Sequence, residues 1–138
     1  MDVTLGRWIQ RGDDIAGARA IIGRPTWGPT AMLADLELRL GLPAAEASRA
    51  EREIAVLERA RGRVGQTPSI FYARSLAVDP TGTAAVLLTM RDALVEGGWS
   101  SDSNDDAGPR LRALAALETL EPLPPGRADR LASVRREL

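Results

Sequence analysis

The stretch FYARSLAVDPTGTAAVLLTMRDALVEGGW, residues 71–99, is the most regular part of this 138-residue chain and decides its fold. Asp79 is a favourable N-cap, and Pro80 at the first helical position already has the backbone φ angle that a helix needs. Gly97 and Gly98 supply a left-handed exit at the other end. The stretch therefore predicts one helix that begins after Asp79 and ends at Gly97.

The same helix has an apolar stripe. Residues at three- and four-residue spacing gather on one side of it, namely Thr83, Val86, Leu87, Met90 and Leu94. The opposite side is polar and carries Arg91, Asp92 and Glu96. We therefore expect the stripe to face the core, with the neighbouring aromatic residues Phe71, Tyr72 and Trp99 as buried anchors.

Four more segments have helical periodicity, at about residues 31–40, 44–63, 110–120 and 127–138. Gly41 ends the first of them, and Ser48 with Glu51 would form a capping box if the second begins late. The fold class predicted from this pattern is mainly α, with about five amphipathic helices in an irregular bundle. A chain of this length fits a single domain, residues 1–138.

The N-terminal residues 1–27 are the part where short strands could form. Residues 3–9, VTLGRWI, alternate so that Val3, Leu5 and Ile9 share a face, although Arg7 on that face weakens the pattern. Residues 15–22 fit either a short buried strand or a helical turn, because periodicity cannot separate the two over so few positions.

Residues 23–30, GRPTWGPT, have the spacing of a Walker A loop through Gly23, Gly28 and Thr30. Pro29 stands where the phosphate-binding lysine belongs, and it also removes a backbone N–H, as does Pro25. One interpretation is a decayed P-loop, and the other, which we favour, is a Gly/Pro-rich turn that caps a helix. Both interpretations predict no nucleotide hydrolysis, and we expect the chain to have no cofactor.

Composition argues against catalysis more broadly. All 18 cationic side chains are arginine, and the chain has no lysine, histidine or cysteine. Histidine-dependent triads, thiolate nucleophiles and histidine or cysteine metal sites are therefore excluded. We expect no catalytic residue, no metal site and no enzyme activity. The N-terminus lacks the apolar core of a signal peptide and the chain lacks a membrane-spanning run, which favours a cytoplasmic protein without membrane contact.

Residues 71–99, together with MLADLELRLGLP at residues 32–43, give the chain a family resemblance over about residues 28–138. This pattern of apolar and capping residues resembles the N-terminal region of bacterial AddB-like PD-(D/E)XK nuclease family proteins. Members of that family are partners of UvrD-type helicases and carry a helicase-like front end that has lost its ATPase residues. The resemblance implies a role in DNA repair or recombination. A PD-(D/E)XK active site needs a lysine, so the nuclease centre of such a protein would lie outside this chain.

The leading hypothesis is a non-catalytic structural domain that docks on the remainder of a larger nuclease protein or on a UvrD-type helicase partner. One alternative is a free-standing helical adaptor, or small subunit, for a protein partner. Another is a helix-turn-helix DNA-binding module, in which residues 31–63 form a hairpin through LGLP. Its candidate nucleic-acid contacts would be Arg49, Arg52 and Arg59, but interleaved glutamates favour a solvated face with internal ion pairs and only weak DNA contact.

Overall fold

The computed structural model describes residues 4–5, 26–102, 107–118 and 121–138, and this part of the chain is mainly α, as predicted. Six helices pack together: α1 (Pro29–Leu40), α2 (Arg49–Gln66), α3 (Ala73–Val78), α4 (Pro80–Glu96), α5 (Pro109–Ala115) and α6 (Arg127–Glu137). A 3-10 turn, η1 (Ala116–Glu118), continues α5. The short helix α3 and the break at η1 were not predicted.

The N-terminal β structure is limited to two-residue segments among the described residues. β1 (Thr4–Leu5) pairs in parallel with β2 (Thr26–Trp27), so that Thr4 lies opposite Thr26. Most of the predicted strand region, residues 3–22, lies outside the described residues, and so do Arg7 and Ile9. The prediction of strands there stays a prediction.

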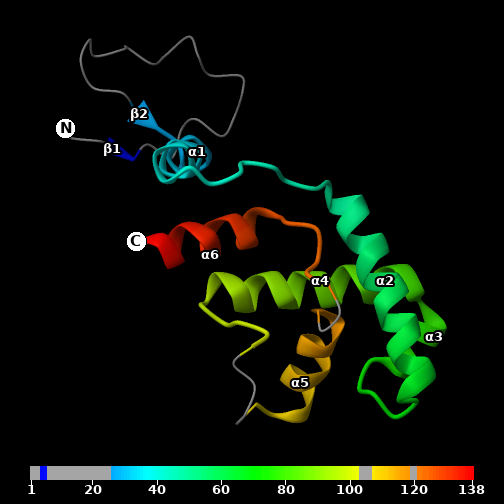
Figure 1. Ribbon diagram of the computed structural model, residues 1–138. Coiled ribbons are helices and arrows are strands. Elements are labelled where there is room, and N and C mark those ends of the chain that lie inside the picture. The colour runs from blue at the N-terminus through cyan, green and yellow to red at the C-terminus, as the bar shows by residue number, and fades with distance from the viewer. Residues whose placement is uncertain (1–3, 6–25, 103–106, 119–120) are drawn as a thin grey trace.

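Helix α4 lies in the middle of the bundle (Figure 1). α2 crosses it near one end, α6 lies along it, and α1 packs on α6. The predicted hairpin of residues 31–63 is therefore wrong. α1 and α2 are joined by the extended connection 41–48 and pack mainly on different helices, whereas a helix-turn-helix needs a short turn between two packed helices.

The predicted capping residues act where they were expected. The Asp79 carboxylate accepts the N–H of Gly82 at 2.9 Å, and Ser48 with Glu51 forms the capping box that starts α2 late. After α1, Gly41 takes a φ of +67°, which a residue with a side chain rarely adopts. At the end of α4, Gly98 and not Gly97 takes the positive φ.

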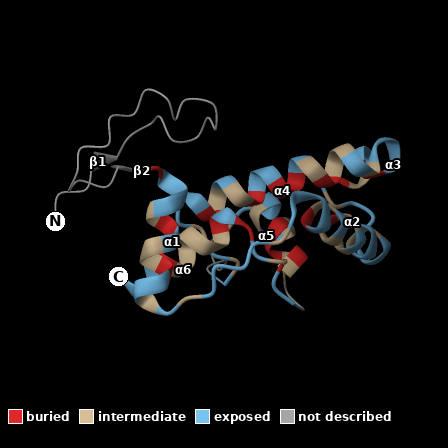
Figure 2. Cartoon of the chain, turned by 90° about the horizontal axis from the view of Figure 1, so that it is seen from above, coloured by how far each residue is buried: buried red, intermediate tan, exposed pale blue. Residues whose placement is uncertain are grey.

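The buried face of α4 matches the predicted stripe only in part: Leu87 is buried and Leu94 packs against the core as expected, but the centre of the buried face differs. The buried residues of α4 are Ala84, Leu87, Leu88, Arg91 and Val95. Figure 2 shows buried positions of this helix in red. This face is rotated by about one residue, roughly 100°, from the expected one, which leaves Val86 58% and Met90 39% exposed. The prediction was wrong because it treated Arg91 as a surface residue, whereas its carboxylate partners allow it to be buried.

Helix α2 shows the same feature. Its buried positions are Arg52, Val56 and Ala60, whereas the apolar residue Ile54 is 58% exposed. An arginine again occupies a core-facing position. The hydrophobic core joins Val56 and Ala60 of α2 to Leu87 and Leu88 of α4.

A cluster of charged side chains holds α2, α4, η1 and α6 together, and we call it the buried charge cluster: Arg52, Arg91, Asp92, Glu118 and Asp129. Arg52 bonds both carboxylate oxygens of Asp92, at 2.6 and 2.8 Å. Arg91 pairs with Glu118 and Asp129. Burial alone would raise the pKa of Asp92, but its hydrogen bonds with Arg52 and Arg91 outweigh that effect and lower the pKa.

A second buried ion pair fixes α1 on α6. Glu37 is only 1% exposed, and both of its carboxylate oxygens accept hydrogen bonds from Arg130, at 2.7 and 2.6 Å. Arg130 also bonds Glu46 at 2.7 Å. The hydrogen bond with Arg130 lowers the pKa of Glu37, so the pair stays charged at neutral pH.

Candidate functional site

The P-loop-like residues are only partly described, since Gly23 lies outside the described residues. Gly28 is the N-cap of α1 with extended backbone angles, and Pro29 and Thr30 form its first turn. Directly before them, Thr26 and Trp27 form β2 within the interval that a P-loop would use to wrap phosphates. The described part of the loop thus has the local geometry of a turn that caps a helix.

The described residues contain neither a candidate metal-binding group nor a candidate membrane-spanning helix. No group of three or more acidic, histidine or cysteine side chains in these ranges is arranged to hold a metal ion. Nor does any helix among the described residues combine the length and apolar character needed to cross a bilayer.

The three arginines predicted as nucleic-acid contacts have different surroundings. Arg52 is 5% exposed and belongs to the buried charge cluster. Arg59 donates to backbone carbonyl oxygens of residues 117, 121 and 122, at 2.6 to 3.1 Å. Arg49 has a largely exposed side chain that bonds Glu53 and the Thr89 hydroxyl. Arg52 and Arg59 are thus committed to the chain's own acceptors.

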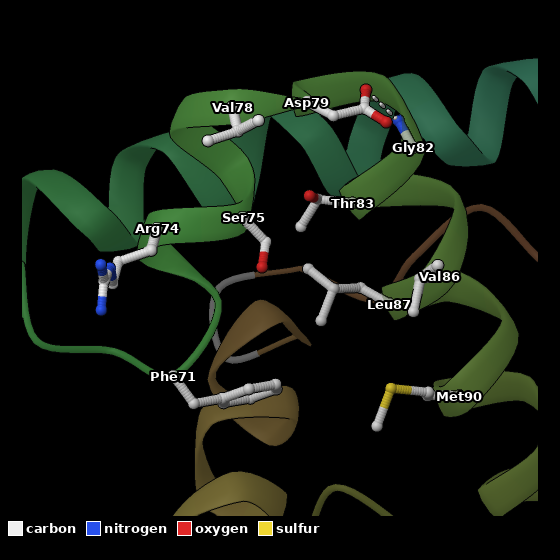
Figure 3. A pocket seen from close by; sticks show the side chains of 10 residues that line it. All are labelled: Phe71, Arg74, Ser75, Val78, Asp79, Gly82, Thr83, Val86, Leu87 and Met90. Carbon is white, nitrogen blue, oxygen red and sulfur yellow. Dashed lines mark hydrogen bonds between the residues drawn. The ribbon is translucent and has the colours of Figure 1, made fainter.

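An open, mainly apolar hollow of about 630 Å³ lies between α3 and α4, and we call it the α3–α4 groove (Figure 3). Leu87, which is 2% exposed, forms its floor. Phe71 and Met90 point toward one another across the opening. The residues that line the groove are Phe71, Arg74, Ser75, Val78, Asp79, Gly82, Thr83, Val86, Leu87 and Met90.

Large apolar side chains lie exposed along this groove. Val78 is 87% exposed, Val86 58%, and Phe71 and Met90 39% each. Single exposed apolar residues are ordinary on protein surfaces, but four that line one hollow form a contiguous patch, which is typical of an interaction site.

The local sequence explains why the groove stays open. Asp79 ends α3 and caps α4, so the two helices meet at one residue and diverge from it. Because Pro80 cannot donate a backbone hydrogen bond, α3 cannot continue straight into α4. Val78 and Val86 therefore flank the resulting corner without covering one another.

Arginine side chains border the groove. The Arg110 guanidinium carbon lies 5.8 Å from the centre of the Phe71 ring, a cation–π distance, and Arg74 is an exposed lining residue. Arg49 lines a smaller adjoining hollow of about 240 Å³ that shares Val86 and Met90 with the groove. The acidic residue in the lining, Asp79, already accepts the Gly82 N–H.

A second large hollow, of about 600 Å³, reaches the buried charge cluster. Its charged lining includes Arg91, Glu118 and Asp129, which already pair with one another. Burial alone would lower the pKa of Arg91, but its hydrogen bonds with the two carboxylates raise it, so the guanidinium stays charged. The three residues hold the helices together through these ion pairs, so none of them offers an unpaired charge to the hollow.

The sequence patterns did not foresee the α3–α4 groove, because they assigned Val86 and Met90 to the core. The one available signal was the sequence Val78-Asp79-Pro80, in which a capping residue directly follows apolar helix-forming residues. Comparison of this chain with protein-family models, with curated proteins and with solved structures finds no significant match.

Proposed function

We propose that this chain is a non-catalytic docking domain that binds a protein partner through the α3–α4 groove. The observation that carries the proposal is the contiguous exposure of Phe71, Val78, Val86 and Met90 around one open hollow. Burial of such a patch against a partner is favourable, at about 25 cal/mol per Å² of apolar surface before the costs of association.

The chemistry of the chain supports a binding role over a catalytic one. Without lysine, histidine or cysteine, it has no imidazole, amine or thiol side chain, so its carboxylates are the main groups left to act as general bases. The groove lining is mainly apolar, and its hydroxyl groups, from Ser75 and Thr83, have no neighbouring side chain among the lining residues that could act as a general base other than the capping Asp79.

The family resemblance identifies the first partner to test. It points to a helicase–nuclease protein of DNA repair or recombination in the cytoplasm, so the docking partner is either the remainder of such a nuclease protein or a UvrD-type helicase. A free-standing adaptor would use the same groove for a different partner. DNA binding has less support, because Arg52 and Arg59 bond groups within the chain.

A binding measurement with the purified 138-residue protein tests the proposal. A purified UvrD-type helicase is titrated with the wild type and with Val86→Asp and Met90→Asp, which place a charge in the groove at exposed positions. The matched control is Leu38→Asp on α1, an equally drastic change at a position that is 80% exposed and does not line the groove. We expect binding by the wild type and the control, and loss of binding by the groove variants.

Turnover assays on the same protein complete the test. We expect no ATP hydrolysis and no Mg²⁺- or Mn²⁺-dependent nuclease activity. Robust metal-dependent turnover would overturn the non-catalytic role, and helicase binding that the groove variants leave intact would remove the groove as the docking site.

A further inference from the structure

The geometry points to an acidic amphipathic helix as the partner segment that occupies the α3–α4 groove. This inference rests on the proposed docking function and adds the chemistry of the partner. Two independent properties of the groove carry it, which are the arrangement of its apolar side chains and the charge of its border.

The apolar side chains suit a helix laid into a groove. Val86 and Met90 are one turn apart on α4 and form one side of the opening, and Phe71 lies across from Met90 (Figure 3). Leu87 closes the floor. A helix that presents large apolar residues at positions i, i+3 or i+4, and i+7 can place its apolar face against such side chains.

The border of the groove is basic and favours acidic residues on the partner. Arg74 and Arg110 are exposed, and neither forms an ion pair with a carboxylate in the described part of the chain. Asp79, the acidic residue that lines the groove, is held by the Gly82 N–H at the beginning of α4. Carboxylates that flank the partner's apolar face would lie near Arg74 and Arg110 and complement their charge.

Other occupants fit these observations less well. In a twofold dimer through the same surface, the groove lining of the second copy would offer the arginines no carboxylate other than Asp79, which already caps α4. A nucleic acid would place phosphates on an apolar surface that also contains the Asp79 carboxylate. A small molecule is buried best in an enclosed pocket, whereas this hollow is open and Val78 on its edge is 87% exposed.

Designed peptides test the inference with defined probes. The first is a fluorescein-labelled helical peptide of about five turns with leucines on one face and glutamates on the other. The second has lysines in place of the glutamates, and the third has alanines in place of the leucines. Fluorescence anisotropy with the 138-residue protein measures the affinity for each peptide and for a labelled duplex DNA.

We expect the leucine–glutamate peptide to bind at least about tenfold more tightly than either of the other peptides. Val86→Asp and Met90→Asp should weaken its binding by at least about tenfold, and Leu38→Asp should leave it unchanged. The charge reversals Arg74→Glu and Arg110→Glu should weaken it by about two- to fivefold each, and Arg39→Glu on α1 should not. Circular dichroism of each variant confirms that the helices are intact.

Several results would overturn the inference. Equal or tighter binding of the leucine–lysine peptide would contradict the acidic preference, and tighter binding of DNA at this surface would favour a nucleic acid. A dimer that Val86→Asp dissociates would make a second copy of the chain the occupant. If the helicase binds in a groove-dependent way but the leucine–glutamate peptide does not, this inference fails while the docking function stands.

Discussion

Two sides of helix α4 depart from the rule that charged side chains are exposed and apolar ones buried. One side buries a charge, and the other exposes apolar side chains. Toward α2 and α6, it buries Arg91, which is 5% exposed, within the buried charge cluster. Toward α3, it exposes Val86 and Met90 along the groove. The buried charges have partners within the chain, whereas the exposed apolar side chains do not cover one another. The first surface therefore stabilises the packing of the helices, whereas the second lacks such pairing and is the one that we propose for docking.

Acid should have the largest effect on stability, because it neutralises carboxylates of the buried charge cluster and of the Glu37–Arg130 pair at once. The pKa values of Asp92 and Glu37 are lowered from ordinary values of 3.8 and 4.5, so the unfolded chain binds protons at a higher pH than the folded one. The free energy of unfolding should therefore be constant from about pH 5.5 to 8.5. It should fall as the pH drops below the ordinary pKa values of 4.5 and 3.8 toward the lowered pKa values of the folded protein. Urea unfolding followed by circular dichroism across this range checks it.

The free energy of unfolding between pH 6 and 8 serves as an internal control for this prediction. The chain has neither histidine nor cysteine, so none of its side chains has an ordinary pKa near neutrality. A marked change in the free energy of unfolding between pH 6 and 8 would contradict the assignment of the pH dependence to the two carboxylates.

The next largest effect should come from Arg91→Met, which keeps the bulk of the side chain but removes its charge. Glu118 and Asp129 lose a charged partner in a site where the Glu118 side chain is only 9% exposed. Removal of one member of a buried ion pair costs about 3–5 kcal/mol of unfolding free energy. Urea unfolding at pH 7 measures the loss.

A double variant sharpens this result. In Arg91→Met with Glu118→Leu, the unpaired carboxylate is gone, and Asp129 keeps Arg52 as a partner. We expect the double variant to recover much of the stability that Arg91→Met loses. If both variants are equally destabilised, packing and not charge pairing accounts for the effect of Arg91.

A smaller effect, of opposite sign, is expected for Tyr72→Phe. The Tyr72 hydroxyl is buried and has no hydrogen-bond partner among the described residues, and burial raises its pKa. Removal of an unsatisfied buried hydroxyl should leave the free energy of unfolding unchanged or raise it by up to about 1 kcal/mol. A loss of more than about 1 kcal/mol in a thermal or urea melt would mean that the hydroxyl has a bonding partner.

The smallest effect on stability is expected for Val86→Asp, on the exposed side of the same helix. Substitutions at exposed positions usually change the free energy of unfolding by less than about 0.5 kcal/mol. The variant should therefore unfold like the wild type in urea and yet lose partner binding. A large loss of stability would mean that Val86 contributes to the fold, and the contrast between the two sides of α4 would fail.

The helix ends that carry a capping residue could be predicted from the sequence, because capping is a local property. Asp79, Ser48 and Gly41 need only a few neighbouring residues to act, and all three take the expected roles. The short α3 and the extended connection 41–48 escaped prediction, since tertiary packing and not local pattern decides them.

The faces of the helices, and with them the groove, could not be predicted in the same way. Whether Arg91 is buried depends on Glu118 and Asp129, which come 27 and 38 positions later in the chain. Whether Val86 is exposed depends on how the helices pack at the corner beside it. An apolar pattern identifies an amphipathic helix, but it does not show which apolar residues find a partner within the chain.

Two arginines of α2, Arg59 and Arg63, should influence the order in which parts of the protein unfold locally. Arg59 and Arg63 donate hydrogen bonds to the main-chain oxygens of residues 116, 117, 121 and 122, more than fifty positions away. Carbonyl groups at the end of a helix lack partners within the helix, and these arginines supply partners for them. Two segments joined in this way should exchange their amide hydrogens with solvent deuterium as one cooperative unit. Arg59→Met should then speed deuterium uptake in α5 and η1 together, ahead of α4.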